Sequence, residues 1–142
     1  MLEIKGSDKG GDKVLYISES KYGDEVINLT RGDDAAVVFP MVNMDDEPYV
    51  MGETEYLIFG LRYVPSKDSE LLVNIESIPG SNRIVFCHDD TADLDIGEYS
   101  AEVQLMTSDG ERITVWPKPI GRYRSREINR KNFCLMPEVV TR

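Results

Sequence analysis

The sequence predicts an all-β domain built as a sandwich, and three observations lead to this fold class. Apolar residues alternate with polar ones at a period of two along several short stretches, which is typical of strands with one buried face. Residues that favour turns separate these stretches, and no stretch of ten or more residues carries a convincing helical stripe. About eight short strands at a spacing of 8–15 residues are typical of a sandwich or a small barrel.

The candidate strands follow one another along the chain, with turn signals between them. Gly supplies a positive φ and Asp or Asn bonds to nearby backbone, so these turns have a physical basis. The strongest hairpin signal is Asp109-Gly110, which lies between two alternating stretches. The expected strands are 13–18, 26–30, 35–42, 55–64, 70–76, 83–88, 98–107 and 111–117, with one or two more between 120 and 140. The expected turns are 21–24, 31–34, 45–48, 79–82 and 108–110.

The length and charge of the chain limit its domain organisation and its partners. Its 142 residues fit one domain: 1–12 as a flexible N-terminal segment, then 13–142 as a single β-sandwich domain with a basic C-terminal segment at 117–142. A formal net charge of −10 repels phosphates, so nucleic acid is not an expected partner. No apolar run approaches the ~20 residues of a membrane span, and the N-terminus lacks the apolar core of a signal peptide. We therefore expect neither a membrane nor a secretory location.

One motif makes a specific structural prediction. Residues 94–99 read LDIGEY at the head of a long strand, which is the sequence form of a tyrosine corner. In such a corner the Tyr99 hydroxyl bonds to upstream backbone, Gly97 allows the sharp turn into the strand, and Asp95 can bond turn amides. Antibody domains carry a Cys two residues beyond this Tyr, where this chain has Ala101, so the inter-sheet disulfide is absent. The motif favours an immunoglobulin-like β-sandwich over a small barrel.

A series of short motifs extends in a fixed order over residues 26–116. They are INLTRGDD at 27–34, the apolar run 35–42, the acidic turn 45–49 that ends in Pro48-Tyr49, EYLIF at 55–59, RIVF at 83–86, Asp90-Thr91, LDIGEY at 94–99, AEVQL at 101–105, Asp109-Gly110 and ITV at 113–115. In this order and spacing the motifs resemble a domain of phage and prophage tail proteins, the N-terminal domain of phage baseplate upper proteins and its stand-alone relatives.

The resemblance implies both a fold and a role. The fold is an immunoglobulin-like β-sandwich, and the role is a structural part of a tail or baseplate with no catalysis and no cofactor. The implied partners are other tail or baseplate proteins or copies of the same chain. The implied location is the host bacterial cytoplasm during assembly and then the virion tail.

The two cysteines and the single histidine leave little room for catalysis. Cys87 and Cys134 lie in apolar settings, so we expect buried free thiols in a reducing compartment. His88 follows Cys87 directly, and neighbouring residues of a strand point to opposite faces, so the two cannot act as nucleophile and base. One histidine does not supply the usual three protein ligands of a catalytic zinc site unless carboxylates and cysteines complete it. We expect no enzyme.

Three further patterns have both a structural and a functional interpretation. Arg31-Gly32-Asp33 spells the integrin-binding tripeptide, but a turn between two strands explains it. The acidic segment 88–95 carries carboxylates of the kind that bind Ca²⁺ from loops, without the spacing of an EF-hand, and turn capping is the favoured role. Asp45, Asp46 and Glu47 are expected to form a solvated tip rather than a general acid/base pair.

Aromatic residues at strand positions suggest the alternative function. They could form a sugar-stacking platform, although aromatics at such positions more often belong to the core or to cross-strand pairs. A small-ligand or carbohydrate-binding module on the same fold is therefore the second hypothesis. The residues are Tyr56, Phe59, Tyr63, Tyr99 and Trp116.

Charge is distributed unevenly along the chain. Residues 1–110 carry 8 Lys+Arg against 23 Asp+Glu, whereas residues 111–142 carry 8 against 3. The basic segment either folds back on its own acidic body or contacts a neighbouring copy or partner, and a head-to-tail contact would generate rings or open stacks. Arg suits such a contact because its planar guanidinium pairs bidentately with carboxylates. The expected contact residues are Lys118, Arg122, Arg124, Arg126, Arg130 and Lys131.

Overall fold

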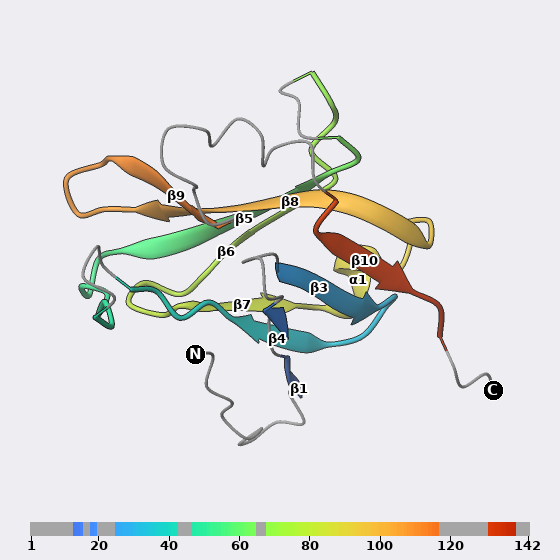
Figure 1. Cartoon of the computed structure of the whole chain (residues 1–142), viewed down its shortest axis with the longest axis horizontal. Coiled ribbons are helices and arrows are strands. Elements are labelled where there is room, and N and C mark those ends of the chain that lie inside the picture. The colour runs from blue at the N-terminus through green and yellow to red at the C-terminus, as the bar shows by residue number, and fades with distance from the viewer. Residues whose placement is uncertain are drawn as a thin grey trace.

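Strands form where the apolar residues alternate, and they assemble into two sheets (Figure 1). The computed structural model describes residues 13–15, 18–19, 25–42, 47–64, 68–116 and 131–138. The strands are β1 (Lys13–Leu15), β2 (Ser18–Glu19), β3 (Glu25–Thr30), β4 (Ala35–Val38), β5 (Tyr56–Arg62), β6 (Val73–Glu76), β7 (Arg83–Phe86), β8 (Gly97–Met106), β9 (Arg112–Trp116) and β10 (Phe133–Met136), and the helix is α1 (His88–Thr91). The described part of the chain is therefore mostly β, with one short helix.

The predicted strands are confirmed, with changes at their ends. In place of the one strand predicted at 13–18 there are two short strands, β1 and β2, the second of which ends at Glu19. The strands predicted at 35–42 and 83–88 end earlier, at Val38 and Phe86. The predicted hairpin forms between β8 and β9, where Gly110 has a φ of 86° and its N–H bonds to the carbonyl of Thr107 at 3.0 Å.

The sheets have three and seven strands. The smaller one has the order β1-β4-β7, and the larger has the order β2-β3-β10-β8-β5-β6 with β9 also paired to β8. Most pairs are antiparallel, but β10 runs parallel to β3 with Phe133 opposite Ile27, and β1 runs parallel to β4. The first long strand and the last strand of the chain thus lie side by side.

Strand β8 organises the larger sheet because it is paired along both edges. Strand β5 covers one edge from Ser100 to Met106, while β10 and β9 divide the other edge between them. The gap between β10 and β9 is filled by the side chain of Asn132, which accepts from the N–H of Ala101 at 2.7 Å and donates to its carbonyl at 3.0 Å. A buried side-chain amide therefore continues the ladder where no strand is present.

The core lies between the two sheets. Phe59 of β5 and Phe86 of β7 meet edge to face with ring centroids 5.1 Å apart, which joins one sheet to the other. Phe133 of β10 contacts both rings. The buried cluster also contains Ile27, Leu29, Ala35, Val37, Phe39, Leu57, Leu61, Val73, Ile84, Tyr99, Ala101, Val103, Leu105, Trp116 and Leu135.

The expected burial of both thiols is wrong. Cys87 is exposed and Cys134 is half-buried, and both are free. In a continuous apolar run the sequence does not show which alternate residues face the core. In the structure Phe86 and Phe133 point inward, and the residue after each points outward. His88 lies in α1 rather than on a strand, so the opposite-face argument does not apply to it.

Candidate functional site

The tripeptide Arg31-Gly32-Asp33 forms the turn between β3 and β4, and its groups are held by other parts of the chain. Arg31 forms an ion pair with Glu138 at 3.1 Å, and this guanidinium hydrogen bond lowers the pKa of the Glu138 carboxyl. Gly32 has a φ of 81°, and its N–H donates to the Thr91 hydroxyl at 2.7 Å. The tripeptide is therefore a structural turn between two strands, as the sequence predicts.

The acidic segment 88–95 contacts this turn directly. The N–H of His88 donates to the Asp34 carboxylate at 2.8 Å, and its ring Nδ1 lies 2.7 Å from the carbonyl oxygen of Gly32. The carboxylate of Asp90 accepts from the N–H of Cys87 at 2.7 Å, which caps the first turn of α1. Asp34 and Asp90 thus act as capping residues. Among the described residues, no group of three or more His, Cys, Asp and Glu side chains is placed to hold a metal ion.

Tyr99 lies at the start of β8, and its hydroxyl donates a hydrogen bond to the carbonyl oxygen of Asp95. This is the backbone contact that defines a tyrosine corner. Tyr63 stacks on the Tyr99 ring with centroids 5.1 Å apart, and the Tyr63 hydroxyl lies 3.5 Å from the Asp95 carboxylate. Burial raises the pKa of Tyr99 to about 12. Gly97 has a φ of 151°, a conformation that side chains rarely adopt. The contribution of Asp95, Gly97 and Tyr99 to stability stays a prediction.

The five aromatics considered for a sugar platform do not share one exposed surface. Phe59, Tyr99 and Trp116 are buried in the core, whereas Tyr56 is half-buried and Tyr63 is 48% exposed. Trp116 packs beside Phe39 with ring centroids 5.7 Å apart. Three of these side chains therefore form part of the core.

Glu55 is a buried carboxylate at the end of the sandwich opposite α1 (Figure 1). It accepts from the N–H of Gly52 at 2.9 Å and from the Tyr49 hydroxyl at 2.7 Å, and these hydrogen bonds lower the pKa of Glu55. Its carbonyl accepts from the N–H of Gly80 at 2.7 Å. The hydroxyl groups of Thr54 and Ser108 lie 2.9 Å apart. These contacts gather three loops, 47–55, 77–82 and 107–111, at one end of the molecule.

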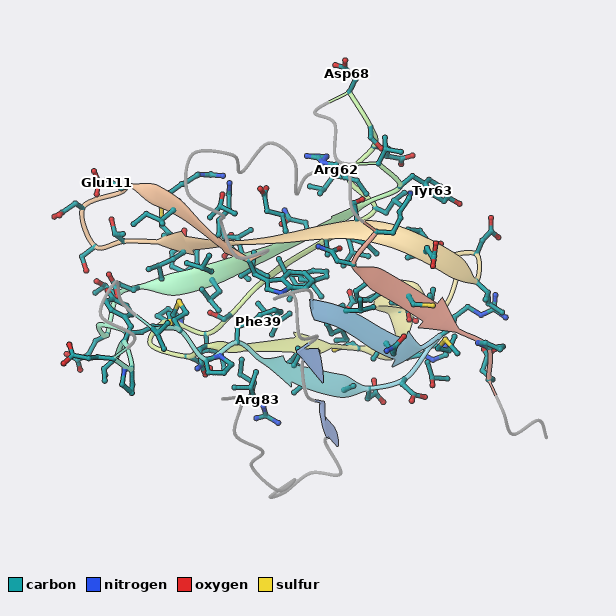
Figure 2. The ribbon with its side chains drawn as sticks, viewed as in Figure 1. Phe39, Arg62, Tyr63, Asp68, Arg83 and Glu111 are labelled. Atoms are coloured by element: carbon teal, nitrogen blue, oxygen red, sulfur yellow. The ribbon has the colours of Figure 1, made fainter. Side chains whose placement is uncertain are left out.

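We call the surface of these three loops the acidic end. Figure 1 shows the loops on one side, opposite α1, and Figure 2 places Glu111 there, far from Tyr63. Apolar side chains are exposed in its first two loops, with Val50 85% and Ile78 74% exposed. The three loops contain no Lys or Arg. Their exposed acidic residues are Glu47, Glu53, Asp109 and Glu111.

The residues expected to form the assembly contact lie almost wholly outside the described residues. Lys131 is described: it is exposed and its ammonium donates to the carbonyl oxygen of Tyr63. The chain on either side of the basic segment is attached to β8, because Trp116 pairs with Val103 and the N–H of Asn132 bonds to the carbonyl of Tyr99 at 3.1 Å. The residues outside the described part are Lys118, Arg122, Arg124, Arg126 and Arg130, as are the N-terminal segment 1–12 and the acidic positions Asp45 and Asp46.

Sequence reasoning missed two residues that organise these regions. Asn132 and Glu55 are both buried polar side chains, and each forms hydrogen bonds with backbone at a distance in sequence or within its own loop. A polar residue directly before an apolar strand, as in Asn132-Phe133 and Glu55-Tyr56, was the available signal. That signal does not identify the partner.

Comparisons with known proteins yield a structural likeness alone. No protein-family model matches the chain, and no curated protein matches it. Among solved structures, the chain is similar to the N-terminal domain of phage TP901-1 ORF48, with 16% identity, a TM-score of 0.42, and coverage of 73% of this chain and 88% of the other. In the part of the chain that the structure describes, no helix has the length and apolar character to cross a membrane.

Proposed function

We propose that this chain is a non-enzymatic structural protein of a phage or prophage tail or baseplate. The observation that carries the proposal is the separation of charge, since residues 1–110 carry 23 Asp+Glu and residues 111–142 carry 8 Lys+Arg against 3 Asp+Glu. A chain with an acidic body and a basic segment presents two unlike surfaces, which suits repeated contact between subunits. The ordered motifs across residues 26–116 add the phage context through the resemblance.

The chemistry of the described groups favours a structural role. His88 is engaged by the β3–β4 turn through Asp34 and Gly32, and Glu55 has a lowered pKa. A carboxyl with a lowered pKa is a poor general acid near neutral pH. Asp90 and Thr91 are engaged in turn and helix contacts. These side chains support the local structure.

The proposal includes an immunoglobulin-like arrangement of the strands. The order β3-β10-β8-β5-β6 faces the pair β4-β7, and the edge strand β3 runs parallel to the last strand β10. The Tyr99–Asp95 hydrogen bond supports the same proposal, since such corners occur in immunoglobulin folds. In the virion, the location would be the tail, after assembly in the host bacterial cytoplasm.

The test of this proposal is the composition of purified particles. An antibody to the chain should label tails in electron micrographs of phage or induced prophage particles, and mass spectrometry should detect the chain at a fixed ratio to major tail proteins. A chain that stays in the supernatant when particles are pelleted would contradict the proposal. The alternative of a carbohydrate-binding module would instead be supported by strong, salt-independent binding on a glycan array.

A further inference from the structure

The acidic end combines exposed apolar side chains with negative charge, and such a surface fits a basic segment that also carries apolar residues. Val50 and Ile78 are among the most exposed large apolar residues of the described part. Glu53, Asp109 and Glu111 are exposed on the same loops. Contact between the first loop and the 77–82 turn follows from the Gly80–Glu55 hydrogen bond of 2.7 Å.

The chain itself contains a segment of the complementary kind. Residues 117–130 contain five Lys or Arg residues and one Glu. Apolar side chains are interspersed among these cations, at Ile120, Tyr123 and Ile128. The segment therefore offers positive charge to the carboxylates of the acidic end and apolar side chains to its exposed Val50 and Ile78.

We infer that the acidic end is the docking surface for residues 117–130 of a second copy of this chain. The inference rests on the proposed function and deepens it, because it names the surface that receives the basic segment. Each copy would then present one donor segment and one receiving end. Because these are different surfaces, successive copies add head to tail.

The geometry of the attachment points favours a second copy over the segment's own body. The residues that flank the segment are attached to β8, Trp116 at Val103 and Asn132 at Tyr99. Lys131, directly after the segment, donates to the carbonyl oxygen of Tyr63, and Figure 2 shows Tyr63 far from Glu111 of the acidic end. The chain that follows the segment is therefore held away from its own acidic end, whereas a neighbouring copy can bring its acidic end to the segment.

The test uses the full chain and a charge exchange between the two surfaces. The receiving variant is Glu53→Lys with Glu111→Lys, and the donor variant is Arg122→Glu with Arg124→Glu and Arg126→Glu. Molar mass is measured by light scattering after gel filtration, over a range of concentrations at low and high salt. Wild type should show higher-mass species that diminish as salt rises, because salt screens the charge contacts.

Each variant alone should stay monomeric, since like charges then face each other. Mixing the two variants should restore higher-mass species, because each reversed surface meets its complement. A matched control, Glu70→Lys with Glu98→Lys, changes two exposed carboxylates outside the three loops of the acidic end and should associate as wild type does. Val50→Ser with Ile78→Ser should weaken association and leave less of it at high salt. Circular dichroism confirms that each variant is folded.

The outcomes separate this inference from the proposed function. Association that survives in the receiving variant but is lost in the donor variant would overturn the acidic end as the docking surface and leave a self-assembling chain. A monomeric wild type at every concentration and salt would overturn docking between copies, and the particle experiment would still decide the structural role. Variants that are monomeric alone and also when mixed would likewise contradict the charge contact.

Discussion

The side-chain amide of Asn132 forms two hydrogen bonds with the backbone of Ala101, at 2.7 and 3.0 Å. The same residue joins the strands on its other sides, because its N–H bonds to Tyr99 and its carbonyl accepts from Ile27. One residue thus connects β8 with the chain that leads into β10 and with β3. Its side chain is buried, with 2% exposed, so water does not replace these bonds.

Asn132→Ala should lower the free energy of unfolding by about 2–4 kcal/mol, because two buried backbone groups of Ala101 lose their partners. Urea denaturation followed by circular dichroism measures this change. Asn74, an exposed Asn in β6, is the control, and Asn74→Ala should change stability by less than about 0.5 kcal/mol. Equal losses of stability at the two positions would show that the hydrogen bonds between Asn132 and Ala101 do not stabilise the sheet.

Tyr99→Phe should destabilise the protein by about 1–2 kcal/mol, because the hydrogen bond from the buried Tyr99 to the carbonyl of Asp95 is lost. Tyr63→Phe should cost less, since its hydroxyl is 3.5 Å from the Asp95 carboxylate and its side chain is 48% exposed. Tyr56→Phe at the start of β5 is a further control. Thermal and urea unfolding of the three variants and of wild type measure how much stability each substitution removes. A Tyr99→Phe protein as stable as wild type would argue against a stabilising corner.

Glu55 should make the stability of the protein sensitive to acid. Its pKa is lower in the folded state than in the unfolded chain, so it contributes stability above pH 4.5 that is lost as the pH falls through the folded value. The stability difference between wild type and Glu55→Gln should therefore be largest at neutral pH and should narrow in acid. Urea unfolding at several pH values measures it. A difference between wild type and Glu55→Gln that stays the same at every pH would contradict this contribution of Glu55.

Gly32→Ala should cost more stability than Gly110→Ala. Both positions have a positive φ, 81° and 86°, which costs a side chain about 1–2 kcal/mol. A Cβ at Gly32 would also lie 3.1 Å from the His88 ring, whereas a Cβ at Gly110 meets nothing within 4 Å. In the His88→Ala background the excess cost at Gly32 should shrink, and a double-mutant cycle measures that coupling. Equal losses of stability from the two Gly→Ala substitutions in wild type would show that the His88 ring moves aside without a loss of stability.

Local patterns predicted much of the fold, and long-range contacts explain what they missed. The period of two along residues 55–64 and 98–107 predicts β5 and β8, because one face of each strand is buried. The parallel pairing of β3 with β10 joins residues more than one hundred positions apart, and no local pattern encodes it. The burial of Cys87 was mispredicted because an apolar run does not reveal which alternate positions face inward.

In the candidate site, too, local motifs could be predicted from the sequence and long-range contacts could not. The turn at 31–34 and the Tyr99 corner depend on neighbouring residues and could be predicted from short motifs. The contact of Gly32 with Thr91 and the ion pair of Arg31 with Glu138 depend on segments far apart in the sequence. The acidic end likewise arises because three separate loops meet.

The parallel pairing of β3 with β10 determines how the protein bears mechanical load. Glu25 begins one strand and Met136 ends the other, and the two strands run in the same direction. A force that pulls the chain apart from these two points acts along the strand axes in opposite directions. It strains the hydrogen bonds between the strands together, in shear, rather than opening them one after another as a zipper. Such a subunit resists extension best when tension enters through its two ends.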